Sequence, residues 1–158
     1  MWVVFFFLFL PLLDFGTLFL RSTFLYMAVH NAARNAAKSR SFLNDVPGQS
    51  SATNTANSTV NNVISMWNGV TVNSILTRIV ITDVNTDAVS FAENPLLTPA
   101  DDSNNTYQIQ VTVTGKVDPL VTFNMPWFGS SGLPGLTKSM SVTMSDRQYV
   151  ENPQGLVL

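Results

Sequence analysis

Few side chains in this sequence suit catalysis. The chain of 158 residues has one histidine, His30, and no cysteine, so no site can combine two imidazoles or use a thiolate. His30 lies in an alanine-rich stretch beyond the apolar N-terminal run, which predicts a solvated residue near the membrane interface and not a member of a Ser/His/Asp triad. We therefore expect a protein that is not an enzyme.

A short acidic segment has the spacing of calcium ligands but lacks two of the required residues. Asp83, Asn85 and Asp87 match the first ligand positions of a calcium loop. Ala88 stands where that loop needs glycine, and Asn94 stands where it needs a bidentate glutamate. The segment predicts a solvated turn, and we expect no metal and no cofactor.

The charge balance excludes further classes of function. The 8 Lys and Arg against 10 Asp and Glu give a net charge of −2, so the chain has no basic excess to neutralise nucleic-acid phosphates. Charged residues make up 11% of the chain and hydrophobic residues 46%, whereas charged residues usually reach ~25%. We expect no nucleic-acid partner and no small-molecule substrate, and the composition favours a structural role.

Asp14 is the only ionisable side chain in residues 2–20. A helix over these residues would be roughly 28 Å long at ~1.5 Å per residue, close to the ~30 Å of a bilayer's hydrocarbon core. A cleavable signal peptide, the main alternative, needs basic residues before the run and small residues at its end, where Phe19 and Leu20 stand. We therefore predict a transmembrane helix over residues 1–21.

The same helix is predicted to continue through residues 22–41. Residues 22–39 include no Gly or Pro, and the alanines among them favour a helix. His30, Arg34 and Lys38 recur every four residues and mark one polar stripe. Pro11, inside the membrane portion, removes one backbone hydrogen bond and is expected to kink the helix.

Beyond this helix the sequence predicts an antiparallel sheet. A polar loop and a short helix, from about Thr53 to Trp67, are expected in residues 42–69, and a β domain in residues 70–158. Alternation of apolar and polar residues predicts three strands, because one face of each is buried. The predicted strands are Ile75 to Val84, Tyr107 to Thr114 and Lys138 to Tyr149.

A second layer and a loop complete the predicted domain. Three strands alone are marginal, so we expect the small-residue face of Ala28 to Ala37 to cover the sheet. The helix should bury Ile109, Val111, Val113, Val142 and Met144. The Pro- and Gly-rich apolar loop 118–136 is expected to fold back over the sheet, with a subunit or membrane contact as the alternative. The predicted fold class is α+β.

Three segments, taken in chain order, form a pattern. They are the Leu10-Pro11-Leu12-Leu13 run leading to Asp14, Phe15 and Gly16, the segment from Asn31 to Lys38, and the C-terminal hairpin from Gln110 to Met144. Together they resemble the TadE/TadG-like pseudopilins of tight-adherence (Tad) pilus systems. The resemblance implies a pilin-like fold, with a long N-terminal membrane-spanning helix that continues into a small exterior domain. It implies a minor pilin or assembly component of the pilus, without catalysis.

The resemblance also implies where the protein lies. It implies a single-pass membrane protein whose C-terminal domain is periplasmic or extracellular, in contact with other membrane helices or pilin-like subunits and with the lipid bilayer. The positive-inside rule alone favours a cytoplasmic domain, because Arg21 and Arg40 follow the span and no basic residue precedes it. Removal of a basic leader would reconcile the two. The alternative function is an accessory single-helix subunit of an integral membrane complex.

Several residues of the helix are candidates for assembly and helix packing. A carboxylate such as Asp14 within a span costs about 2.5–3.5 kcal/mol on insertion scales, so it should be protonated or paired. Arg21 of a neighbouring chain, or the amine of Met1, would pair with Asp14 and set the register between subunits; the alternative places Asp14 near the headgroups. The full set of candidates is Pro11, Asp14, Gly16, Arg21, Ala32, Ala33 and Arg34.

Overall fold

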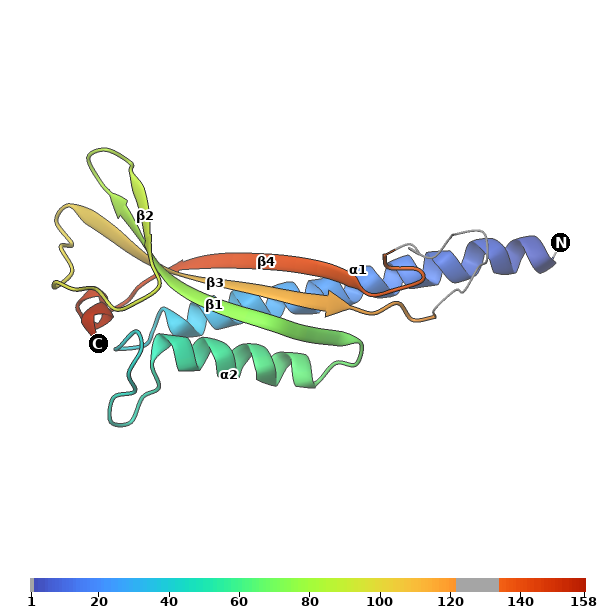
Figure 1. The fold of residues 1–158 in the computed structure, drawn as a ribbon, viewed down its shortest axis with the longest axis horizontal. Helices are drawn as coiled ribbons and strands as arrows, with labels where there is room; N and C mark the ends of the chain where they lie inside the picture. The colour runs from blue at the N-terminus through green and yellow to red at the C-terminus, as the bar shows by residue number, and fades with distance from the viewer. Residues whose placement is uncertain (1, 122–133) are drawn as a thin grey trace.

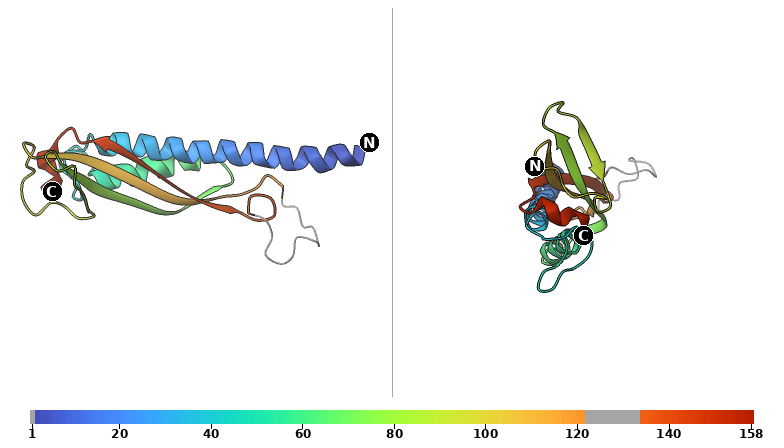
Figure 2. Two further views of the ribbon diagram at one scale, coloured as in Figure 1. Left: turned by 90° about the horizontal axis from the view of Figure 1, so that it is seen from above. Right: turned by 90° about the vertical axis from the view of Figure 1, so that its left-hand side faces the viewer.

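The computed structural model describes residues 2–121 and 134–158. Two helices lie on one face of an antiparallel sheet, and the longer helix projects past the sheet toward the N-terminus (Figure 1, Figure 2). The α+β class and the apolar N-terminal helix are therefore confirmed. The projecting half of the helix and the sheet-containing head define the two ends of the molecule.

Helix α1 spans Trp2–Ala36 without interruption, as the sequence predicted. Pro11 lies inside it, and α1 as a whole shows no sharp bend in Figure 2, so the expected kink is not seen. The helix ends at Ala36 and not near residue 41. At this end the N–H groups of Lys38 and Ser39 bond the carbonyls three residues before them, which tightens the last turn. The Ala37 carbonyl accepts the backbone N–H of Glu151, from the chain after the last strand, at 3.0 Å.

The C-terminal half of α1 packs against the sheet, as predicted. Its small side chains lie on one face because they recur at spacings of three and four residues. Alanine lets the helix approach the sheet closely, and these positions are almost completely inaccessible to solvent. The buried alanines are Ala28, Ala32, Ala33, Ala36 and Ala37.

Helix α2 spans Ala52–Ser65 and confirms the predicted short helix. Ser51 caps its N-terminus, because its hydroxyl oxygen accepts the backbone N–H of Asn54 at 3.3 Å. Every fourth residue of α2 is buried, and these residues form an apolar stripe that packs on α1 and on the first strand. The stripe consists of Ala52, Ala56, Val60 and Ile64.

The sheet has four described strands, so the prediction of three was wrong. They are β1 (Val70–Asp83), β2 (Val89–Ala92), β3 (Asn105–Val117) and β4 (Met140–Tyr149), in the order β2-β1-β3-β4, with every neighbouring pair antiparallel. The missed strand, β2, has four residues and no fully buried side chain, so it carries no alternation to detect. A short 3₁₀ helix, η2 (Pro153–Val157), follows β4.

Strand β3 lies at the centre of the sheet and supplies much of the core. Tyr107, Ile109, Val111 and Val113 alternate along it and are buried beneath the helices, as predicted. The other two residues expected in the core, Val142 and Met144, lie on β4, are partly buried and pack against this cluster. Helix α1 covers β3 and β4, while α2 covers β1.

The connection between β3 and β4 leaves the sheet and follows α1. Its described ends, residues 118–121 and 134–139, contact the helix at Asp14 and Leu18. The centre of loop 118–136, with Pro126, Trp127 and Phe128, lies outside the described residues. At its two ends this loop therefore meets the projecting part of α1 and not the face of the sheet.

Asp45 holds the loop before α2 in place. One of its carboxylate oxygens, Oδ1, accepts the backbone N–H of Ser51 at 2.7 Å and the side-chain amide of Asn54 at 2.9 Å. The hydrogen bond from the Ser51 backbone, followed by that from Asn54, lowers the pKa of Asp45 from its ordinary value of 3.8. Asp83 and Asp101 each accept N–H groups from their own turns in the same way, which also lowers their pKa.

Acid is expected to weaken the Asp45 loop. Because the folded-state pKa is depressed, the stabilisation is present above pH 3.8 and is lost as the pH falls through the folded-state pKa. Asp45→Asn keeps an acceptor oxygen but does not titrate, so its melting temperature should fall less than that of the parent between neutral pH and about pH 2.5. Asp83 and Asp101 affect both proteins alike. Circular-dichroism melts in one detergent measure the difference, and equal acid shifts would contradict the prediction.

Candidate membrane-proximal site

The end of β3 runs down α1 toward the N-terminus of the helix. Gly115 lies against Leu25, where a Cβ would come within 3.5 Å of the leucine side chain and 2.9 Å of the Thr71 carbonyl oxygen. The contact with Leu25 would be an ordinary one, so glycine at this position is required by the close approach of the Thr71 carbonyl on β1 and not by the helix. The next contacts occur at Arg21 and then at Asp14, so the chain descends along the helix as it leaves the sheet.

Asp14 binds this descending chain through its carboxylate. Its Oδ1 accepts the consecutive backbone N–H groups of Leu120 at 2.9 Å and Val121 at 3.0 Å. The side chain is only 1% exposed. Its second oxygen, Oδ2, has no hydrogen-bond partner among the described residues. The one acidic residue of the apolar run thus caps a non-helical segment of its own chain.

Arg21 lies nearer to the head than Asp14 does. It connects α1 with the end of β3 and the start of β1. Its guanidinium donates a hydrogen bond to the Asp118 carbonyl, and the Asp118 N–H donates to the Gly69 carbonyl at 2.9 Å. Gly69 has a φ of +82°, and a Cβ there would overlap the Arg21 guanidinium. The Asp118 carboxylate accepts the Ser139 hydroxyl at 2.6 Å. Arg21 therefore fixes the ends of β1 and β3 to α1.

An aromatic pair and a glycine complete the contacts with α1. Phe24 stacks on Trp67, with ring centroids 3.5 Å apart and planes at 15°, which holds the end of α2 against α1. Gly135, with φ +87°, lies against Leu18, whose side chain is 5% exposed. Both ends of the β3–β4 connection are thereby tied to the projecting half of α1.

The predicted assembly residues divide into separate groups. Asp14 and Arg21 come together as two attachments of the same chain segment. Gly16 is exposed, and no atom of the described residues lies within 4 Å of a Cβ built on it. Ala32 and Ala33 are fully buried in their own domain. The two others lie apart from these: Pro11 is half-buried in the helix and Arg34 is exposed. The pairing of Asp14 between chains stays a prediction.

Four of the residues that form this site were not candidates from the sequence. Leu120 and Val121 contribute backbone N–H groups, which any residue but proline possesses, so their identities carry no signal. Asp118 contributes a carbonyl for the same reason. Gly135 is one of several glycines in its loop, and nothing in the sequence distinguishes it from the others.

His30 makes a contact between the helix and the sheet. Its Nδ1 lies 3.0 Å from Oδ2 of Asp146 on β4, and the Gln148 side chain donates to the same oxygen at 3.0 Å. The histidine side chain is 45% exposed, so this contact stands at the edge of the core. The single imidazole of the chain thus joins α1 to β4.

The acidic turn at the end of β1 is exposed, as predicted. Asp83 Oδ1 accepts the N–H groups of Asn85 at 2.8 Å and Thr86 at 2.9 Å, so its carboxylate organises the turn itself. Within the described residues, no group of three or more His, Cys, Asp or Glu could hold a metal ion.

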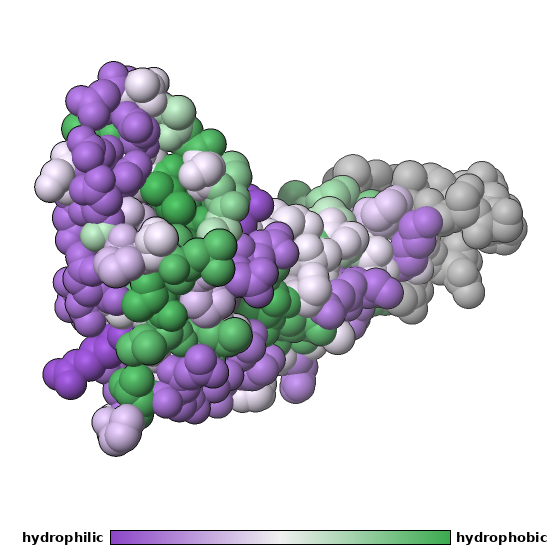
Figure 3. All heavy atoms as spheres, turned by 60° about the vertical axis from the view of Figure 1, so that its left-hand side comes forward, coloured by the Kyte–Doolittle hydropathy of each residue, from purple (hydrophilic) through white to green (hydrophobic). Residues whose placement is uncertain are grey.

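The face of the sheet turned away from the helices carries two arginines around an aromatic ring. The guanidinium of Arg78 lies 4.3 Å from the centre of the Phe91 ring, and that of Arg147 lies 5.6 Å from it. Arg78 also donates from Nε to the Gln110 side chain at 3.0 Å. Figure 3 shows that apolar groups gather among hydrophilic ones on the head. Exposed arginine and aromatic side chains of this kind are frequent in protein–protein contacts.

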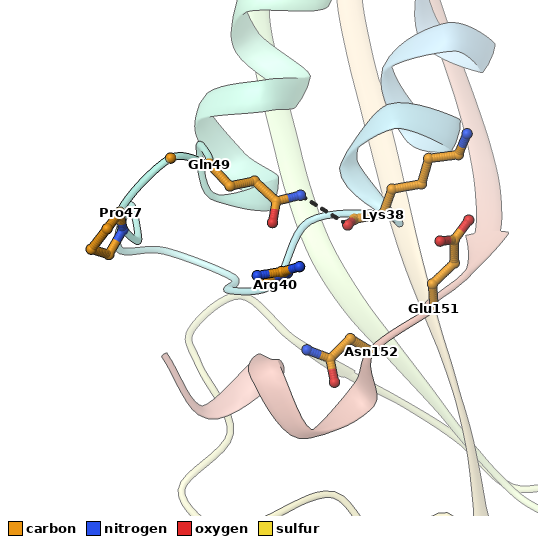
Figure 4. Close-up of a pocket in the computed structure, with 7 residues that line it drawn as sticks. Lys38, Arg40, Pro47, Gln49, Glu151 and Asn152 are labelled. Atoms are coloured by element: carbon orange, nitrogen blue, oxygen red, sulfur yellow. Dashed lines mark hydrogen bonds between the residues drawn. The ribbon is translucent and has the colours of Figure 1, made fainter.

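An open polar pocket lies where α1 ends (Figure 4). Its walls bring together the chain after α1, the loop before α2 and the chain after β4. Lys38 and Arg40 face Glu151 and Asn152 across it, and Gln49 donates to the Lys38 carbonyl at 3.1 Å. Cationic and anionic groups are mixed here, so the pocket does not select a ligand of either charge.

The fold and the contacts along α1 define an α+β protein built on one long apolar helix. By length and composition, α1 can cross a membrane, and it is the one helix of the described residues that can. No family model, curated protein or solved structure matches the chain.

Proposed function

We propose that this chain is a single-span, membrane-anchored, pilin-like structural protein that acts as a minor pilin or assembly component of a Tad-type pilus. It has no catalytic role in this proposal. The helix holds the protein in the membrane or in a filament core, and the head makes protein contacts on the periplasmic or extracellular side. The resemblance of three chain segments to TadE/TadG-like pseudopilins supports the identity of the system.

One observation carries the proposal: the same helix is buried in the core at one end and exposes large apolar side chains at the other. Toward its C-terminus, α1 buries alanines under the sheet. Toward its N-terminus, the same helix exposes large apolar side chains that water solvates poorly, so a bilayer or neighbouring helices must cover them. These exposed side chains are Leu12 (69%), Phe15 (55%), Phe19 (73%) and Leu20 (56%).

Gly16 gives the projecting helix a position for close packing. It lies between these large side chains and has open space around it. Small residues let membrane helices approach one another, so a neighbouring subunit can pack against α1 at this level. The arginine and aromatic cluster of Arg78, Phe91 and Arg147 offers a second contact surface on the head.

Enlarging Gly16 tests the assembly role. Gly16→Leu should leave the protein in the membrane fraction but reduce the yield of sheared filaments strongly, because the larger side chain keeps helices apart. Gly16→Ala is the matched control with a smaller side chain, and it should lose much less. Filament yield and membrane content are measured by immunoblot in the same cells.

Three other results would contradict a part of the proposal. Recovery of full-length protein as a soluble monomer without detergent would contradict the anchor. A normal filament yield with Gly16→Leu would remove the packing role. If the protein forms no filament and co-purifies in detergent with a fixed set of partners, it is an accessory subunit of a membrane complex.

A further inference from the structure

The segment that follows β3 lies beside the apolar part of α1. Its residues Leu120 and Val121 are bound at Asp14, seven residues before Arg21, which corresponds to roughly 10 Å along the helix axis. On its free side, α1 remains apolar above this level, since Phe19 and Leu20 are 73% and 56% exposed. A medium that covers these two helix residues also surrounds the segment bound at Asp14.

This segment itself presents apolar side chains outward. Leu120 is 54% exposed and Val121 is 42% exposed, although both are tied to the helix through their backbone. Together with the outward residues of α1 they extend one apolar surface from the helix to the chain beside it. A second element thus accompanies the helix over this part of its length.

The backbone N–H groups of this segment have an acceptor within the protein. Non-helical backbone is tolerated at membrane depth only where its N–H and C=O groups find partners within the protein. Asp14 supplies such a partner, since its Oδ1 accepts the N–H groups of both Leu120 and Val121. This accounts for an acidic residue inside an otherwise uncharged run.

Cationic side chains mark the level above it. Arg21 bonds the Asp118 carbonyl, Lys116 precedes Asp118 by two residues, and Lys138 adjoins Ser139, which bonds the Asp118 carboxylate. One cationic side chain, that of Arg21, therefore contacts Asp118, and two lysines lie close to Asp118 and Ser139 in the sequence. Lysine and arginine at the boundary of a span are attracted to anionic lipid headgroups.

From this arrangement we infer that the described segment that follows β3, residues 118–121, is a second membrane-inserted element, which enters the lipid beside α1 with Leu120 and Val121 below the headgroups. The inference rests on the membrane anchor proposed above and adds to it a fixed orientation of the head. A head attached by one helix could rotate and tilt, whereas one attached by α1 and by this segment holds its sheet at a constant angle to the bilayer.

Site-directed spin labelling tests the depth directly, because the chain has no cysteine of its own. Leu120→Cys, with Val121→Cys as a second probe, is labelled with a nitroxide in full-length protein and reconstituted into vesicles of phosphatidylcholine and phosphatidylglycerol. Oxygen concentrates in lipid and a nickel chelate stays in water. The ratio of oxygen to nickel accessibility at position 120 should be several-fold higher than at a water-exposed reference.

Two reference positions make the result decisive. Val84→Cys, at the far end of β1, matches Leu120 in exposure, with 55% against 54%. Leu12→Cys, on the projecting helix, reports the span itself. If position 120 matches position 84 while position 12 is in lipid, the inference is overturned and the anchor stands. If position 120 excludes both probes, a protein partner covers it and the inference is also overturned. If position 12 is in water, the anchor itself fails.

Discussion

Val111→Asp is expected to lower the free energy of unfolding by about 3–5 kcal/mol, because it places an unpaired charge in the centre of the core. Val111 is 0% exposed on the central strand, where it faces the helices. Its direct neighbour on β4 is Asp146, so the new carboxylate would also stand opposite a like charge. Burial and repulsion therefore act in the same direction.

Chemical denaturation of full-length protein in detergent measures this loss. Ser145→Asp is the control, because Ser145 is exposed on β4 next to Asp146 and should change the unfolding free energy by no more than about 0.5 kcal/mol. Val111→Thr keeps the shape and adds one polar atom, so it should fall between the two. Equal stability of Val111→Asp and Ser145→Asp would show that position 111 is hydrated.

Periodicity made the larger elements predictable. Strand β3 alternates between buried and less buried residues except at Gln110, because one side faces the helices. Helix α2 repeats its apolar residues every four positions because one stripe is buried. The alanines of α1 indicated a close helix–sheet contact for the same reason. In each case the residues that face the core recur at the spacing of the helix or strand, and this recurrence is visible in the sequence.

Elements without a periodic buried face could not be found in this way. Strand β2 is held by backbone pairing with β1, as between Val80 and Phe91, and its side chains are largely exposed. Just after the end of α1, the Ala37 carbonyl accepts the N–H of Glu151, more than one hundred residues away in the sequence. Such contacts come from the tertiary fold, and local sequence does not encode their position.

The sequence allowed us to predict the hydrogen-bond acceptor of the candidate site, Asp14, but not the N–H groups that donate to it. Asp14 is conspicuous as a lone charge in an apolar run, so its importance followed from composition alone. Its partners are two backbone N–H groups of Leu120 and Val121, which follow β3. A search for opposite charges pointed to Arg21, which in the structure bonds a carbonyl of the same descending chain.

Replacing Asp14 separates its two possible roles. Asp14→Leu removes the acceptor and leaves the N–H groups of Leu120 and Val121 without a partner in apolar surroundings, at a cost of about 1–3 kcal/mol for each donor. Relief of the buried carboxylate offsets part of this, so we expect the local contact to weaken by about 2 kcal/mol. Asp14→Asn keeps an acceptor oxygen for both N–H groups and removes only the charge.

Amide hydrogen exchange in micelles measures the local effect. In Asp14→Leu, the amides of Leu120 and Val121 should exchange roughly thirty-fold faster, since ~1.4 kcal/mol corresponds to a factor of ten. The amide of Val111 serves as an internal control, because it lies within the β1–β3 pairing and away from the contact with Asp14. Unchanged exchange at residues 120 and 121 in Asp14→Leu would exclude the capping role.

Asp14→Asn then tests whether the charge also acts between subunits. Oδ2 has no hydrogen-bond partner among the described residues, but it is buried within this chain, so a cation of a neighbouring chain would have to displace a neighbouring group to reach it. If the charge sets the register between chains, Asp14→Asn should insert and exchange like the parent but give fewer filaments. A parental filament yield would leave Asp14 with the intramolecular role alone, because an amide cannot replace a carboxylate in an ion pair but can still accept the two N–H groups that bind the chain after β3 to α1.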